Sequence, residues 1–506
     1  MSVTAAPPEH VDVLILGAGL SGIGAAAHLT RAAPRKSFAI LEAREAIGGT
    51  WDLFRYPGIR SDSDMYTLGY DFKPWTNEKS IADGADIREY IRETAREHGI
   101  DEHIRFGHKV VRADFDSSQA RWTVTAQRAD TGEEVQHTCS FLFANTGYYD
   151  YDQGYTPDFA GQDDFAGQVV HPQFWPEDLD VTGKRIVVIG SGATAVTLIP
   201  ALVSAGAGEV TMLQRTPTYI VALPSVDKLA KWAYDHFPSK TAYAVARWEN
   251  VLLTMGSYQL SRRRPKAMKA ILRKRLERML PADYDIDTHF NPPYDPWDQR
   301  LCVVPSGDLF KAIQKGKATI VTDHIERFTE RGIALKSGNE LEADIVVTAT
   351  GLRMKVVGGI RTSVDGKQIQ PHDTVAYKGM MLAGVPNFAL TIGYTNASWT
   401  LKADLVADYV VRLLQEMDRR GAAIVEPVYD DDRPADQPFM DLKSGYVTRA
   451  LDQLPKQGHK APWKLHQNYI LDLAILKRQK IDDGVLRFRG RRQAPAAGTE
   501  RELATA

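Results

Sequence analysis

The chain has 506 residues, of which 43% are hydrophobic and 25% charged, a balance typical of a globular protein with two to four domains. Its formal net charge of −2 excludes a general electrostatic attraction to nucleic acid or to anionic membranes. Its cysteines, Cys139 and Cys302, lie far apart, which excludes a disulfide scaffold, a CxxC redox pair and a cysteine-rich zinc site. We therefore expect a cytoplasmic protein without a metal site.

The first predicted element is a dinucleotide-binding turn. An apolar run at 11–16 is typical of a buried strand, and Gly17, Gly19 and Gly22 follow before an alanine-rich helix. Glycines at this spacing allow a tight turn and a close approach of the backbone to a pyrophosphate at the helix N-terminus. Glu42 ends the next strand, twenty residues after the last glycine, where a carboxylate can accept hydrogen bonds from a ribose diol.

A second turn of the same kind is predicted in the uncharged stretch 186–208. This stretch is long enough to cross a bilayer, but its glycines favour a buried parallel strand, a turn and a helix. Gly190, Gly192 and Ala195 form the GxGxxA variant, and Arg215 follows at the offset that the acid has in the first motif. A guanidinium there suits a 2′-phosphate and predicts NADPH, with a surface arginine as the alternative.

Two such motifs in one chain indicate a flavoenzyme that passes hydride from a nicotinamide to a flavin. The segment LEAREAIGGTW at 41–51 places a glycine pair and Trp51 just beyond the ribose acid, where the backbone could follow an adenine dinucleotide. The strand ends FLFANTG at 141–147 and ADIVVTATG at 343–351 resemble each other. We interpret these two as the places where the chain crosses between two nucleotide domains.

Two longer motifs carry a family resemblance. FAGQVVHPQFWP at 165–176 resembles the FxGxxxHxxxWP fingerprint of type I Baeyer–Villiger monooxygenases, and GGTWDLFRYPGIRSD at 48–62 is similar to their second fingerprint. WDQRLC, TLKADLV and LPKQG resemble the bacterial branch that includes the ethionamide-activating monooxygenase and relatives implicated in long-chain alkane use. The resemblance covers residues 10–490. It places His171 on the linker between the domains, as a packing residue or a coupler of domain movement and not as a catalytic base.

The resemblance implies an α/β fold with two Rossmann-like dinucleotide-binding domains, for FAD and NADPH, and a helical insertion. It also implies insertion of oxygen beside a ketone carbonyl through a peroxyflavin, with oxidation of sulfides and thiocarbonyls. The expected partners are dioxygen and a small lipophilic ketone or sulfide. The alternatives are a flavin monooxygenase that mainly oxygenates sulfur or nitrogen or hydroxylates long alkyl chains, and a catalytically silent NADPH-binding regulator.

By the same resemblance, Arg300 and Asp62 are the predicted catalytic residues. A fixed cation beside the flavin would favour a peroxide anion, and Asp62 would hold that cation in place. Gln299 stands where many relatives have a lysine that helps to bind the NADPH phosphate. Phosphate recognition is therefore expected to depend on Arg215 and Thr216, and the preference for NADPH over NADH is open.

The remaining implications concern cofactor contacts and domain order. The expected FAD contacts are Gly17, Gly19, Ser21, Gly22, Glu42, Gly49, Thr50, Trp51, Asp62, Val110, Gly351 and Asn396. The expected NADPH contacts are Gly190, Ser191, Gly192, Thr194, Ala195, Arg215 and Thr216. The predicted order is an FAD-binding segment at 1–150, an NADPH-binding segment at 151–220, a helical insertion at 221–298, a second NADPH-binding segment at 299–345, a second FAD-binding segment at 346–490 and a disordered tail at 491–506.

A basic amphipathic helix is predicted at 261–281. The stretch carries nine Lys or Arg and one Glu, and its apolar residues recur at helical spacing: Met268, Ile271, Leu272, Leu276 and Met279. Two interpretations are open. The apolar face packs on the protein's own core under a solvated basic face, or it lies in a membrane interface and makes a peripheral contact with the inner membrane.

Overall fold

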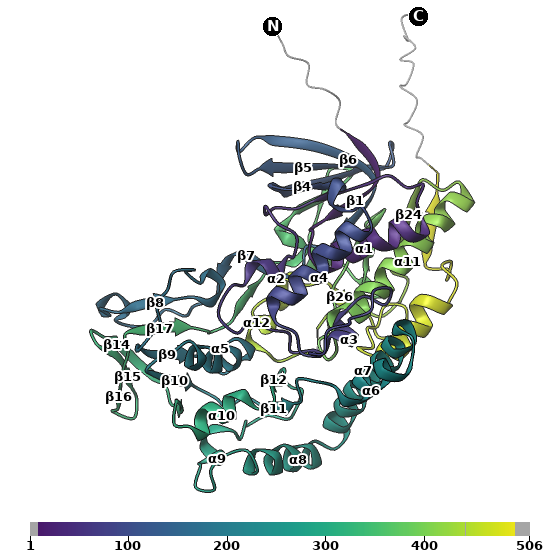
Figure 1. Cartoon of the computed structure of the whole chain (residues 1–506). Helices are drawn as coiled ribbons and strands as arrows, with labels where there is room; N and C mark the ends of the chain where they lie inside the picture. Colours follow the sequence, from purple (N-terminus) through teal and green to yellow (C-terminus); the bar gives the residue numbers. More distant parts are fainter. Residues whose placement is uncertain (1–8, 441, 491–506) are drawn as a thin grey trace, which may run out of the picture.

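Two large β-sheets organise the chain, one mixed and one fully parallel (Figure 1). The computed structural model describes residues 9–440 and 442–490, so the predicted tail at 491–506 lies outside the described residues. The α/β class and the two Rossmann-like units predicted from the sequence are confirmed.

The first sheet is built around the first glycine motif. Its parallel strands follow the order β23 (Phe388–Leu390), β6 (Glu134–Ala144), β1 (His10–Leu16), β2 (Phe38–Leu41) and β3 (Ile104–Arg105). In register, Leu14 pairs with Ala39 on one side and Leu142 on the other. The antiparallel strands β5 (Arg121–Arg128) and β4 (His108–Asp116) extend the sheet. Helices α1 (Leu20–Ala32) and α11 (Trp399–Arg420) pack against each other and share a core with one face of β1. The other face of β1 belongs to a second core, and because both faces are buried the strand is apolar throughout.

The second sheet is fully parallel. Its order is β13 (Ala318–Thr322), β10 (Glu209–Gln214), β9 (Arg185–Ile189), β17 (Ile345–Thr348) and β8 (Gln168–Val170). Helix α5 (Ala193–Ser204) follows β9, so the uncharged stretch 186–208 forms a buried strand and helix as predicted. Among the helices of the described part of the chain, none is long and apolar enough to span a bilayer.

Two short strands form the connection between the sheets. Strand β7 (Tyr149–Gly154) pairs antiparallel with β18 (Leu352–Met354), so the two predicted crossings run side by side. The residues before each strand pack against a glycine turn. A Cβ added to Gly17 would lie 2.7 Å from the carbonyl oxygen of Asn145, and one added to Gly190 would lie 2.3 Å from that of Ala349. Both turns therefore need glycine at this position.

The residues of the FxGxxxH fingerprint pack closely at the edge of the second sheet. A Cβ on Gly167 would lie 2.5 Å from the Phe165 ring, and a Cβ on Gly154 would lie 2.1 Å from Cε1 of His171. Burial lowers the pKa of His171, which favours the neutral imidazole. His171 thus packs closely on the crossing strand β7.

The helices α6 (Lys228–His236), α7 (Ser239–Arg263) and α8 (Pro265–Glu277) lie within the predicted insertion at 221–298. On α8, Met268 and Leu272 are buried against Tyr219, and Leu276 joins the core of the second sheet. Most of the apolar face of α8 is therefore covered by the protein itself, whereas Ile271 and the basic face are exposed.

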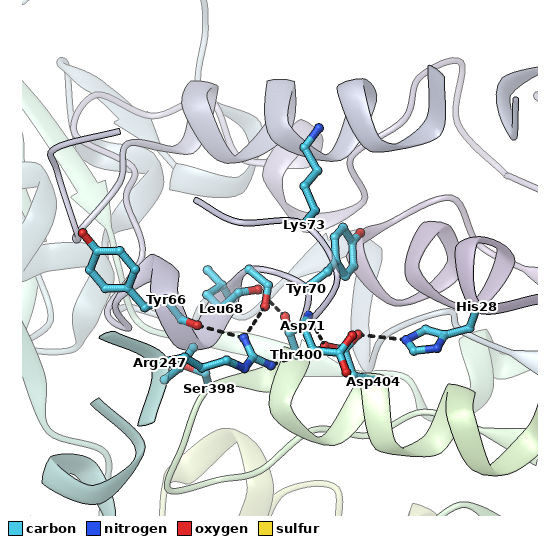
Figure 2. A network of polar contacts seen from close by, with 12 residues as sticks. His28, Tyr66, Leu68, Tyr70, Asp71, Lys73, Arg247, Ser398, Thr400 and Asp404 are labelled. Carbon is cyan, nitrogen blue, oxygen red and sulfur yellow. Dashed lines mark hydrogen bonds and ion pairs between the residues drawn. The ribbon is translucent and has the colours of Figure 1, made fainter. Parts of the chain in front are cut away.

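A buried arginine anchors α7 to the first domain (Figure 2). The Nη1 of Arg247 donates hydrogen bonds of 2.8 Å to the carbonyl oxygens of Tyr66 and Gly69, and its Nη2 lies 3.4 Å from Oδ2 of Asp404 on α11. The other carboxylate oxygen of Asp404 lies 3.4 Å from Nε2 of His28 on α1. Because Arg247 and Asp404 are both buried, each supplies the counter-charge that the other needs.

Candidate functional site

A cavity of about 1240 Å³ extends from the first glycine turn to the second. Gly19 and Glu42 line one end, Gly192 and Arg215 line the other, and Arg300 lines the region between them. In open parallel sheets, ligands bind beyond the carboxyl ends of the strands, which is where both glycine turns lie. The cavity therefore combines two nucleotide sites with a space between them.

The first end fits an adenine dinucleotide. Helix α1 begins after Gly19 with no side-chain cap among the described residues, which leaves first-turn amides for a phosphate. Glu42 accepts hydrogen bonds from the amides of Ala18 (2.7 Å) and Arg44 (2.9 Å). Burial raises its pKa, and these two bonds oppose the rise. A Cβ on Gly49 would lie 2.9 Å from Cα of Gly19, so the second segment passes directly beside the turn.

The second end leaves more room. A Cβ built on Gly192 would meet nothing within 4 Å in the described structure, and α5 starts there without a side-chain cap. The Oγ of Ser191 donates to the carbonyl of Thr216 (3.0 Å), which ties the turn to the segment after β10. Arg215 is exposed and forms no ion pair with any described residue. This end fits a dinucleotide with an additional phosphate.

Between the two ends, Arg300 and Asp62 form a bidentate ion pair. The Nε of Arg300 lies 2.9 Å from Oδ2 of Asp62, and its Nη2 donates to Oδ1 at 3.3 Å. The Asp62 charge holds the pKa of Arg300 above its ordinary value, so the guanidinium stays charged at any working pH. The structure thus brings the two predicted catalytic residues together inside the cavity.

Aromatic side chains that the sequence analysis missed surround this pair. Tyr148, Tyr149 and Tyr446 line the cavity, and the rings of Tyr148 and Tyr149 are 4.6 Å apart. Burial raises the pKa of all three, so the phenols near Arg300 are neutral. Trp399 also lines the cavity, and its Nε1 donates to Oγ of Ser21 at 2.6 Å. The wall near the cation is therefore apolar with a few phenolic hydroxyls.

Among the predicted site residues, all but Gly22, Ala195 and Asn396 line the cavity. A Cβ on Gly22 would lie 1.8 Å from the carbonyl oxygen of Gly17, so this glycine permits helix packing. Ala195 is buried in the core of the second domain. Asn396 is buried, and its Nδ2 donates to the carbonyl of Gln467 at 2.9 Å, so it ties the loop before α11 to the C-terminal segment.

Several further cations line the cavity: Arg44, Arg60, Lys109, Lys336, Lys355, Lys443 and Arg449. Most of them are neutralised; Arg60, for example, pairs with Asp308 at 2.7 Å. Lys336 forms no ion pair with a described residue, and its amide donates to the carbonyl of His324, which lines the same end as Arg215. Lys336 is therefore a second free cation at the more open end.

The known proteins that this chain resembles are flavin-dependent monooxygenases. Residues 79–392 match the flavin-binding monooxygenase-like family, and 15–74 match an NAD(P)-binding Rossmann-like domain. The FAD-containing monooxygenase EthA of Mycobacterium tuberculosis H37Rv is 55% identical over 487 residues, which cover 96% of this chain and 99% of that protein. The probable FAD-binding monooxygenase AlmA of an Acinetobacter species is 49% identical over 490 residues, covering 96% and 98%.

The fold has a counterpart among solved structures. An oxidised steroid monooxygenase bound to NADP superposes with a TM-score of 0.74 at 22% identity, covering 95% of this chain and all of that one (100%). The identity to EthA confirms the branch that the short sequence motifs indicated. The chain belongs to the flavin-binding monooxygenase-like family.

Proposed function

We propose that the protein is an FAD- and NADPH-dependent Baeyer–Villiger monooxygenase that acts on a small lipophilic ketone. The overall reaction consumes the ketone, dioxygen, NADPH and a proton, and gives an ester or lactone, NADP⁺ and water. The observation that carries the proposal is the Arg300–Asp62 pair, which lies in the cavity between the two glycine turns. The full-length similarity to EthA and AlmA, which are described as FAD monooxygenases, supports the flavin assignment.

Each end of the cavity would bind one of the two cofactors. The uncapped start of α1 and the Glu42 carboxylate would hold the pyrophosphate and ribose of FAD. The uncapped start of α5 and the free cations Arg215 and Lys336 would hold NADPH through its phosphates. Bound FAD would supply the activation of dioxygen, and bound NADPH would supply the two electrons.

Arg300 would act on the charge that develops during oxygen insertion. An oxygen nucleophile that attacks a carbonyl carbon carries negative charge, and a fixed cation favours this charge at no cost in reorganisation. Asp62 occupies Nε and Nη2 of the guanidinium, and no described acceptor contacts Nη1. Nη1 therefore remains a donor for the reacting oxygen atoms, while Asp62 acts as a positioning residue.

The aromatic wall would set the class of substrate. Tyr148, Tyr446 and Trp399 line the cavity and present mainly apolar surface to it. Apolar pockets with a few polar groups select lipophilic ligands and orient them through the polar groups. A ketone with an alkyl chain fits this environment, and a sulfide of similar shape would also be accepted.

Oxygen-isotope labelling tests the proposal directly. The FAD-loaded enzyme is incubated with NADPH, labelled dioxygen and a medium-chain 2-ketone, and in parallel with an alkyl sulfide. We expect an ester that carries one labelled oxygen atom between the carbonyl carbon and the migrated alkyl group, together with a labelled sulfoxide. Formation of sulfoxide or hydroxylated alkyl chain with no ester would contradict the proposal and favour the other monooxygenase class.

A further inference from the structure

The helical insertion presents apolar side chains on its outer surface. Along α7, exposed small or apolar residues recur at every fourth position: Ala244, Trp248, Leu252, Gly256 and Leu260. The exposed fraction is 57% for Leu252 and 62% for its neighbour Leu253. The side of the helix most nearly opposite Trp248 contains Tyr243 and Ala246, and Arg247 and Val251 extend this buried side along the first domain. The orientation of α7 is thus fixed, and the apolar stripe faces away from the core.

The neighbouring helices enlarge this surface. On α6, Trp232 is 46% exposed and its ring centroid lies 5.6 Å from that of Phe237. The ring of Trp248 lies 6.2 Å from that of Tyr469, which begins the short helix α13 (Tyr469–Asp472). Of the thirteen exposed large apolar side chains among the described residues, nine belong to this region, which we call the outer apolar face: Leu229, Trp232, Phe237, Trp248, Leu252, Leu253, Leu260, Ile470 and Leu471.

A group of cations adjoins the outer apolar face. Six exposed residues at the end of α7 and along α8 form no ion pair with any described residue, and we call them the basic junction: Arg263, Arg264, Lys266, Lys274, Arg275 and Arg278. Figure 1 shows α6 and α7 side by side at the outer edge of the molecule, with α8 continuing the same edge. Since the whole chain has a net charge of −2, this concentration of positive charge is local.

We propose that the outer apolar face and the basic junction dock the protein on an anionic lipid bilayer. Tryptophan and leucine side chains enter the boundary between headgroups and acyl chains, and lysine and arginine attract anionic headgroups. Contiguous exposed apolar surface on a soluble chain marks an interaction site. Anionic headgroups supply the negative charge that complements the basic junction, whereas a second copy of the chain on the same surface would present the same cations. The charge pattern therefore favours lipid over self-association.

The docking surface ends beside the loop that carries Arg300. The Nη1 of Arg262, the residue next to the basic junction, donates to Oδ1 of Asp298 at 2.8 Å. The ring of Tyr258 on α7 contacts that of Trp297 in the same loop, with centroids 5.6 Å apart. A lipophilic molecule dissolved in the bilayer would therefore be close to this loop. The docking itself does not depend on the proposed reaction.

Vesicle binding of the full-length, FAD-loaded protein tests the proposal without any substrate. We expect co-sedimentation with phosphatidylcholine vesicles that contain phosphatidylglycerol at low salt. Binding should be about tenfold weaker at high salt or without the anionic lipid, because the charges are then screened or unmatched. Trp248→Ser/Leu252→Ser/Leu253→Ser should lose most of the binding, and Lys266→Glu/Lys274→Glu/Arg275→Glu should lose the preference for anionic lipid.

Matched variants elsewhere keep the test specific. Leu451→Ser and Lys367→Glu change an exposed leucine and an exposed lysine outside the docking surface and should bind vesicles like the wild type. FAD content and NADPH oxidation should be unchanged in all variants, which shows that they are folded. Absence of wild-type binding at low salt, or equal binding by the Trp248 triple variant, would overturn the proposal. So would a wild-type dimer that the triple variant converts to monomer while neither binds vesicles.

Discussion

Arg300 and Asp62 are 238 residues apart in the chain, yet they form a two-point ion pair with contacts of 2.9 and 3.3 Å. Asp62 lies in the segment that follows β1 and β2 of the first sheet. Arg300 lies just before β12 (Cys302–Pro305), in the part of the chain that also contains the second sheet. The pair therefore links two nucleotide-binding units at the point where their ligands would meet. We therefore propose that the pair acts both in the chemistry and in the alignment of the domains.

Arg300→Ala is expected to separate cofactor binding from oxygen insertion. The variant should retain FAD and some NADPH oxidation, because neither glycine turn is altered. Ester formation should fall by a factor on the order of 10²–10³, which is typical for loss of one preorganised charged donor. The consumed oxygen should appear as hydrogen peroxide. Ester yield, sulfoxide yield and hydrogen peroxide are measured on the same preparation, and sulfoxide formation should suffer less than ester formation.

Asp62→Ala is the companion variant, with Asp308→Ala as the control. Asp62→Ala should lower ester formation more mildly, because the guanidinium remains but is less well oriented. Asp308 pairs with another cavity arginine, Arg60, and its removal should leave the ratio of ester to hydrogen peroxide near the wild-type value. Ester formation by Arg300→Ala at the wild-type rate would rule out the catalytic assignment.

Arg215 and Lys336 are expected to select NADPH over NADH. A charge-assisted hydrogen bond to a phosphate contributes about 1.5–3 kcal/mol, so Arg215→Ala should weaken NADPH binding by about 10–100-fold. Lys336→Ala should act in the same direction with a smaller effect, and Lys317→Ala, outside the cavity, should have none. Binding of NADH should change little in each case, as judged by steady-state KM values for both nucleotides. Equal losses for NADPH and NADH would exclude this phosphate site.

The two glycines of the second turn should respond differently to alanine. Gly190 has a φ of +134°, and a Cβ there would lie 2.3 Å from the carbonyl oxygen of Ala349. Gly190→Ala should therefore lower the free energy of unfolding by about 1–3 kcal/mol through overpacking. Gly192 has ample space in the described structure, so Gly192→Ala should fold normally but bind NADPH more weakly, because the Cβ would stand where the pyrophosphate approaches. Thermal unfolding and nucleotide titration distinguish the two effects, and normal NADPH binding by Gly192→Ala would argue against the placement.

The parts of the site with fixed sequence spacing could be predicted from the local pattern, whereas the Arg300–Asp62 pair, which joins distant segments, was predicted only through the family resemblance. Gly17 and Glu42 lie on one strand–turn–helix–strand unit, whose geometry fixes their relation. Tyr148 and Tyr446 come from separate segments, and no local pattern in the sequence distinguishes them from core tyrosines. Asn396 stays a predicted FAD contact: its Nδ2 donates to the carbonyl of Gln467, and its Oδ1 has no partner among the described residues.

The helical insertion shows that the sequence also could not predict which helix faces are covered. The periodicity of α8 correctly predicted an apolar face, but periodicity does not identify what covers that face, which is the neighbourhood of Tyr219. The apolar stripe of α7 was missed because this helix has apolar residues on both sides. Ala246 lies on the inner side and Leu252 on the outer side, so apolar residues occur all round the helix and no amphipathic pattern stands out in the sequence.

Arg247→Ala is expected to destabilise the attachment of the insertion. Removal of one partner from a buried ion pair typically costs about 3–5 kcal/mol, because the other charge is left without compensation. Here the loss would leave the buried Asp404 with His28 as its remaining ion-pair partner and would free the carbonyl groups of Tyr66 and Gly69. Lys231→Ala, which breaks an exposed pair with Glu78, should cost at most about 1 kcal/mol. Urea unfolding of the FAD-loaded proteins compares the two, and similar losses would show that the buried network contributes little.

Glu42 should make FAD retention depend on pH. Burial raises the pKa of Glu42, and hydrogen bonds from ribose hydroxyls would favour the carboxylate and lower this pKa when FAD is bound. FAD therefore binds best above the raised pKa and binds more weakly as the pH falls below it. Glu42→Gln should bind FAD about 10–100-fold more weakly at neutral pH and should lose this acid-induced release. Glu45→Gln changes an exposed carboxylate outside the cavity and should behave like the wild type. The fluorescence of released flavin during acid titration measures the effect, and an unchanged release profile in Glu42→Gln would remove Glu42 from the ribose site.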